Sequence, residues 1–240
     1  MKLKSKMKLK AIVNIGAVTL VAGLIVGCSD SSNSPSAPEM NDYEITLINL
    51  SSNQPLSPMA VIIHEASYSG WAIGTASTAG LEHLAEGGDN STFLVEARTA
   101  NAPGVESGEG VIIPGGSELV DVSVHRGSDL KLTVASMLVN TNDAFTGGTG
   151  IDLSSLSIGD ELKVRLPIYD AGTEVNNELV GTIPGPADGG EGFNSDRDDV
   201  NVVSRHPGVV SNVDGYTDSV LEQSHRFDSP IAQLVVRRVN

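Results

Sequence analysis

Short segments of alternating apolar and polar residues, separated by turn residues, constrain the fold of this chain most strongly. Glu118–His125 (ELVDVSVH) and Asp129–Leu138 (DLKLTVASML) both alternate. This period of two is typical of strands with one buried face. Arg126-Gly127-Ser128 lies between them. We therefore predict that the two segments form a β-hairpin.

Several other segments have the same character, and long helical periodicity is absent, which disfavours a parallel α/β layout. One short helix is expected at Leu81–Glu86, ended by Gly87-Gly88-Asp89 through a left-handed cap. Gly181–Asp199 should be a long loop. About seven or eight strands predict an all-β antiparallel sandwich. The further predicted strands are Tyr43–Leu50, Met59–His64, Ser91–Thr99, Glu161–Leu166, Val200–Val203 and Ile231–Val239.

The first residues have the layout of an export signal. Five lysines precede an apolar run from Ala11 to Gly27, which is short for a bilayer span. The end of this run resembles the bacterial lipoprotein signal, because small residues precede Cys28. The resemblance implies cleavage before Cys28 and lipidation of its thiol, and Ser29 favours the outer membrane. The alternatives are an uncleaved membrane anchor and a cleaved signal without lipid.

The rest of the chain divides into a spacer and one domain. Residues 28–42 are rich in Ser, Pro and Asn and predict a flexible tether, while residues 43–240 suit a single β domain. Without the five leader lysines, 10 basic residues face 30 acidic ones. Such a surface repels nucleic acid and anionic lipid head groups. Because Cys28 is the single cysteine, internal disulfides and multi-cysteine zinc sites are excluded.

Two loops that follow apolar runs are crowded with oxygen-bearing side chains. The first holds Asn140, Asn142 and Asp143, and the second holds Asp170, Glu174 and Asn176 through Glu178. Calcium takes six to eight oxygen ligands of these kinds. We therefore expect a calcium site, and the alternative is a solvated acidic loop.

Within these loops, Thr141–Phe145 and Asp170–Asn176 resemble the two signature segments of the spondin N-terminal domain family, and His206-Pro207-Gly208 resembles a later one. The resemblance extends over residues 43–239. It implies a C2-like sandwich of eight antiparallel strands with one calcium ion. The implied metal ligands are Asp143, Asp170 and Glu174, although Glu174 stands where animal members have Asp. Asn142 and Glu178 are expected as supporting oxygens.

Other patterns point to no further chemistry. Asn194–Asp199 begins like an EF-hand loop, but Asp199 stands where that loop needs glycine, which excludes the motif. The five histidines include no HExxH pair, and neither a Gly-x-Ser-x-Gly elbow nor a phosphate loop occurs. His206 is more simply a turn histidine than a ligand. Aromatic residues, at 4%, are too few for a large sugar- or base-stacking surface.

These observations predict a membrane-anchored lipoprotein of the cell envelope that binds calcium and serves adhesion or recognition without catalysis. Two alternatives remain. One is a structural envelope protein with no functional metal, and the other is a hydrolase that uses the loop carboxylates.

Overall fold

The computed structural model describes residues 39–127 and 129–240. The predicted signal peptide, Cys28 and most of the tether lie outside these residues. Strand β1 begins at Met40, so the folded domain starts earlier than Tyr43, the predicted boundary. Within the described part of the chain, no helix is both long and apolar enough to cross a membrane.

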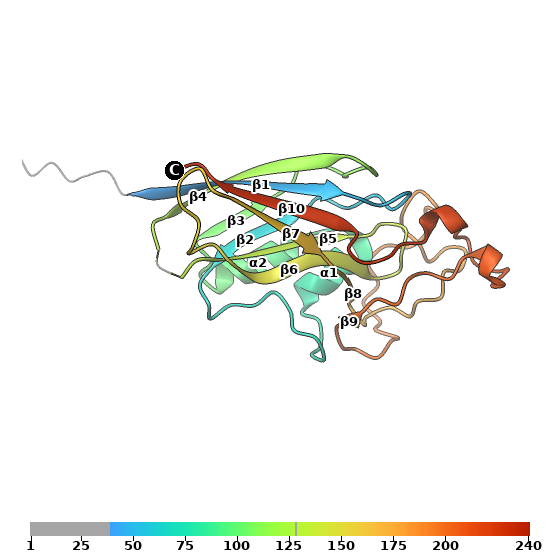
Figure 1. The fold of residues 1–240 in the computed structure, drawn as a ribbon. Coiled ribbons are helices and arrows are strands. Elements are labelled where there is room, and N and C mark those ends of the chain that lie inside the picture. The colour runs from blue at the N-terminus through green and yellow to red at the C-terminus, as the bar shows by residue number, and fades with distance from the viewer. Residues whose placement is uncertain (1–38, 128) are drawn as a thin grey trace, which may run out of the picture. The chain divides into compact units, whose positions relative to one another are not determined.

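Two antiparallel sheets form a β-sandwich, which confirms the predicted fold class (Figure 1). The first sheet has the order β4 (Ser117–His125), β1 (Met40–Asn49), β10 (Ala232–Arg238) and β7 (Glu161–Leu166). The second sheet has the order β3 (Gly104–Ser107), β2 (Ala60–His64), β5 (Lys131–Met137), β6 (Ala144–Asp152), β8 (Ile168–Asp170) and β9 (Ser204–Arg205). The described residues thus contain more strands than the predicted seven or eight, because β3, β8 and β9 are short and carry no alternating pattern.

The main core lies between the two sheets. Alternate residues of β1 point inward and are buried, among them Tyr43, Ile45 and Leu47. Val61 of β2 and Leu132 of β5 belong to the same buried cluster. The alternation read from the sequence therefore selects the inward face of each strand, and burial of that face supplies the main driving force for folding.

Two helices cover the outer face of the six-stranded sheet, which is why β2 is buried at every position. Helix α1 (Ala79–Gly87) confirms the predicted helix and ends at Gly88 in the left-handed conformation. Helix α2 (Ser91–Thr99) contradicts the strand predicted over the same residues. Its buried residues Phe93 and Leu94 lie one helical turn before the buried Ala97, a spacing that fits a helix face better than a pleat.

The predicted hairpin is also wrong. Strand β4 pairs with β1, whereas β5 pairs with β2 and β6 in the other sheet. The chain therefore passes from one layer to the other between β4 and β5. Period-two alternation indicates a strand with one buried face, but it does not identify the neighbouring strand.

Two further differences concern the region near the acidic loops. Residues 144–152, where no strand was predicted, form β6, in which a Cβ on Gly147 would lie 2.3 Å from the carbonyl oxygen of Val134. The strand predicted at Val200–Val203 is displaced to β9. Two short 3₁₀ helices lie farther along the chain, at Asn212–Asp214 and Gln223–His225.

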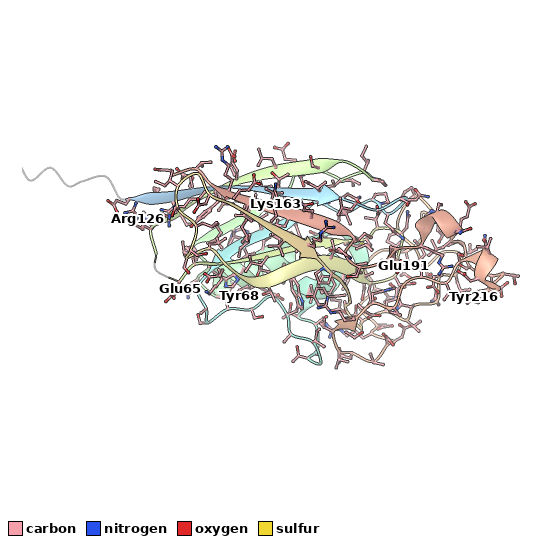
Figure 2. The ribbon with its side chains drawn as sticks, viewed as in Figure 1. Glu65, Tyr68, Arg126, Lys163, Glu191 and Tyr216 are labelled. Carbon is pink, nitrogen blue, oxygen red and sulfur yellow. The ribbon has the colours of Figure 1, made fainter. Side chains whose placement is uncertain are left out.

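The long connection from β8 to β10 gathers at one end of the domain (Figure 1). We call its residues 171–203 and 206–231 the loop cap. As predicted, Gly181–Asp199 contains neither helix nor strand. Three buried residues, Ile183, Val209 and Leu221, form a small cluster of their own beneath it. Figure 2 shows Glu191 and Tyr216 of the cap at the end opposite Glu65, Tyr68 and Arg126.

Candidate metal centre

The pairing of β6 with β8 brings the two predicted acidic segments together. In this antiparallel pair Ala144 lies opposite Asp170. Asp143 directly precedes β6, and its carbonyl oxygen accepts the backbone N–H of Ala171 at 3.2 Å. Strand pairing therefore places Asp143 and Asp170, which are distant in sequence, side by side at the sheet edge where the loop cap begins.

Asp143 is the most unusual carboxylate of the site because it is fully buried. Its Oδ2 accepts the backbone N–H groups of Thr173 at 2.8 Å and Glu174 at 3.2 Å. Its Oδ1 is buried without a hydrogen-bond partner. Burial raises the pKa of Asp143 to about 8, and the adjacent charge of Asp170 adds to this shift. Binding of a proton or a cation at Oδ1 of Asp143 would therefore be favourable.

Asp170 is held by two donors and is 5% exposed. The backbone N–H of Gly172 donates to Oδ1 at 2.7 Å, and Nδ2 of Asn176 donates to Oδ2 at 2.7 Å. Burial raises its pKa despite these bonds. Gly172 has a φ of 70°, and a Cβ there would lie 2.3 Å from the carbonyl oxygen of Val202. The tight turn after Asp170 therefore requires glycine.

Glu174 and Asn142 form a third side of the site. Nδ2 of Asn142 donates to Oε1 of Glu174 at 2.9 Å. Burial, together with the charges of Glu86, Asp198 and Glu191, raises the pKa of Glu174 to about 7. Glu174 thus links the pair of Asp143 and Asp170 to these three further acids, two of which belong to the loop cap.

Glu178 is brought to the same region but is differently engaged. Its backbone N–H lies 3.4 Å from Oδ1 of Asn142, while its Oε1 accepts the backbone N–H of Val210 at 3.2 Å. Asn140 is also occupied elsewhere, since its Nδ2 donates to the carbonyl oxygen of Asn53 at 3.0 Å. These two residues anchor loops around the site.

Sequence reasoning missed two participants, Thr173 and Glu86. The hydroxyl of Thr173 donates to Oδ2 of Asp143 at 3.3 Å, and the Thr173 side chain also acts on the carboxyl group of Glu86, whose pKa it lowers against the effect of burial. Glu86 lies near the end of α1, is 1% exposed and has a pKa raised by burial. The pattern of residues 81–86 predicted a helix, but it held no sign that one acid of that helix reaches the loop cap.

The acidic run Asn194–Asp199 makes structural contacts instead of forming an EF-hand. Oδ1 of Asp198 accepts the backbone N–H of Val175 at 2.9 Å. Arg197 donates from Nε and Nη2 to the two carboxylate oxygens of Glu82, at 2.8 and 2.6 Å. This bidentate ion pair holds residues 194–199 against α1.

The side-chain oxygens of this site could supply some, but not all, of the ligands that a hard cation requires. Within residues 39–127 and 129–240, no three His, Cys, Asp or Glu side chains converge closely enough to hold a metal by themselves. Calcium, however, also accepts amide carbonyls, backbone carbonyls and water. The unpartnered Oδ1 of Asp143, beside Asp170, fits such an ion in chemistry and in charge.

Comparison of this sequence with protein-family models and with curated proteins finds no match.

Proposed function

We propose that this protein is a lipid-anchored module of the cell envelope that binds one calcium ion at Asp143 and Asp170, with Glu174, and acts in adhesion or recognition. The observation that carries the proposal is the buried, unpartnered Oδ1 of Asp143. Leaving a buried polar atom unpaired costs about 1–3 kcal/mol, and more for a charged one. A bound calcium ion offsets this cost.

The resemblance of Thr141–Phe145 and Asp170–Asn176 to spondin N-terminal domains supports the same ion and the same ligands. So does the burial of the carboxylates, because Asp143 and Asp170 are 0% and 5% exposed. Groups so enclosed suit a small ion better than a bulky substrate. We therefore propose binding and not catalysis.

Isothermal titration calorimetry with calcium tests this proposal. We expect one calcium ion per chain, and no binding heat in the Asp143→Asn variant. Asp152→Asn is the matched control, since Asp152 lies at the other end of β6 and is exposed. The proposal fails if the wild-type protein shows no binding heat at millimolar calcium.

The recognition role rests on the loops that the ion would fix. Val175 lies between Glu174 and Glu178, Val180 follows them, and the two valines are 38% and 78% exposed. We propose that calcium holds this segment in one conformation for an envelope or extracellular partner. Cells that display the protein should adhere in calcium and detach in chelator, and adhesion that persists in chelator would contradict this role.

The anchor is proposed from the leader sequence. Lipidation of Cys28 would place the module on a membrane, with Ser29 favouring the outer one. Incorporation of radiolabelled palmitate that is lost in Cys28→Ser would support the anchor. An unlabelled wild-type protein would exclude it.

A further inference from the structure

We propose that His206 is a positioning residue for the calcium site, acting on Asp170 through the side-chain amide of Asn176. This inference rests on the proposed function, since it concerns the same ion. It gives a role to the His206-Pro207-Gly208 segment, which contributes no ligand in the site described above.

A chain of three hydrogen bonds carries the inference. The backbone N–H of Gly208 donates to Nδ1 of His206 at 3.0 Å. Nε2 of His206 lies 3.0 Å from Oδ1 of Asn176. Nδ2 of Asn176 in turn donates to Oδ2 of Asp170 at 2.7 Å.

The chain fixes the orientation of every group in it. Because Nδ1 of His206 accepts a hydrogen bond, the neutral ring must carry its own proton on Nε2. Nε2 therefore donates to the amide oxygen of Asn176, which forces the amide NH₂ toward Asp170. Gly208 has a φ of 101°, a backbone conformation that glycine adopts readily and that completes the turn onto Nδ1.

The ring itself is held in place. His206 is half-buried, and its ring packs against Phe227 with a centroid separation of 5.4 Å. Without the Nε2 donor, the bond to Asp170 alone would oppose rotation of the Asn176 amide, and a rotated amide would face Asp170 with its oxygen. Two oxygens would then repel, and the Asp170 carboxylate would lose the orientation that a cation needs.

Two substitutions test the role. His206→Phe keeps an aromatic ring against Phe227 but removes both nitrogens, whereas His206→Gln restores a donor near the position of Nε2. We expect His206→Phe to weaken calcium binding about tenfold, the lower end of the range for outer ligand-sphere changes. His206→Gln should recover most of the affinity. His125→Phe, an exposed histidine at the end of β4, is the matched control.

A double-mutant cycle separates positioning from a general loss of structure. In an Asn176→Ala background the His206→Phe change should have no further effect on calcium affinity, since the link is already broken. A tenfold loss that persists in that background would overturn the inference.

The luminescence lifetime of bound terbium in H₂O and D₂O provides a second readout. It should show additional water on the ion in His206→Phe, because Asp170 would coordinate less well. If the wild-type protein binds calcium and His206→Phe binds it equally tightly, only the positioning role is overturned. If the wild-type protein binds neither calcium nor terbium, the proposed function fails and this inference falls with it.

Discussion

Thr173 donates both its backbone N–H and its hydroxyl to Oδ2 of Asp143, at 2.8 and 3.3 Å. The two acidic segments are thereby joined through one carboxylate oxygen, while the other oxygen of the same group has no partner. Because of this asymmetry, a proton or a cation bound at Asp143 changes the stability of the whole site.

Asp143→Asn should stabilise the protein when calcium is absent. The amide oxygen can keep the bonds from Thr173, and the new NH₂ group can take the position of the unpartnered Oδ1 beside Asp170. We expect a gain of about 1–2 kcal/mol in the free energy of unfolding in chelator above pH 8, where Asp143 is ionised, from removal of an unpaired buried charge. Urea denaturation of both proteins in chelator measures it, and a loss of stability would contradict the account.

Without calcium, stability should fall as the pH rises toward 8. The pKa values of Asp143 and Glu174 are raised to about 8 and about 7, against about 4 for unfolded carboxyl groups. The folded state therefore holds more protons, so this contribution is complete below about pH 4 and is lost as the pH passes the folded values.

A buried histidine acts in the opposite direction at lower pH. Burial lowers the pKa of His206 to about 4, so its contribution is present above about pH 6.5 and is lost as the pH falls toward 4. The carboxyl effect is therefore clearest between about pH 6.5 and 8. In chelator, the melting midpoint should fall as the pH rises across this window, and saturating calcium should abolish this pH dependence. A midpoint in chelator that does not change with pH would contradict the raised pKa values of the buried acids.

Gly147→Ala should destabilise the sandwich strongly. A Cβ at this position would lie 2.3 Å from the carbonyl oxygen of Val134 and 2.8 Å from Cη2 of Trp71. Overpacking of this kind costs about 1–3 kcal/mol. Gly110→Ala is the control, because a Cβ there meets nothing within 4 Å. Equal urea midpoints for the two variants would show that β6 does not pack as described.

Arg197→Gln should loosen the loop cap more than it lowers global stability. The Arg197 and Glu82 side chains are 24% and 8% exposed, so we expect a loss of about 1–2 kcal/mol after allowing for partial screening. Amide hydrogen exchange should accelerate across residues 194–201. Arg126→Gln, which breaks an ion pair whose side chains are 52% and 68% exposed, should leave those amides unchanged. Unaltered exchange in Arg197→Gln would show that the ion pair does not hold the loop.

The sequence predicted strands better than their partners. Alternation in Glu118–His125 and Asp129–Leu138 correctly indicated two strands, but their assignment to different sheets depends on contacts with β1 and β2 that no local pattern encodes. Ser91–Thr99 was misjudged because its β-branched and aromatic residues favour strands, whereas packing of Phe93 on the sheet stabilises a helix.

The candidate site was predictable to the same extent. The oxygen-rich loops that follow apolar runs indicated this region, and the family resemblance implied Asp143, Asp170 and Glu174 within it. The structure brings the two loops together through the bonds from Thr173 and Glu174 to Asp143. Glu86 and Thr173 could not be identified, because their roles arise from the packing of α1 against the loop cap. The bonds of Asn176 and His206 likewise depend on segments that meet only in the folded chain.

Thermal melting of the purified protein, with calcium and with chelator, tests the central claim most directly. An ion that binds the folded state alone stabilises it by about 2.7 kcal/mol at a hundredfold excess over its dissociation constant, which raises the midpoint by several degrees. We predict such a shift in the wild-type protein and none in Asp170→Asn. A wild-type midpoint that is indifferent to calcium up to millimolar concentrations would contradict a calcium site between Asp143 and Asp170.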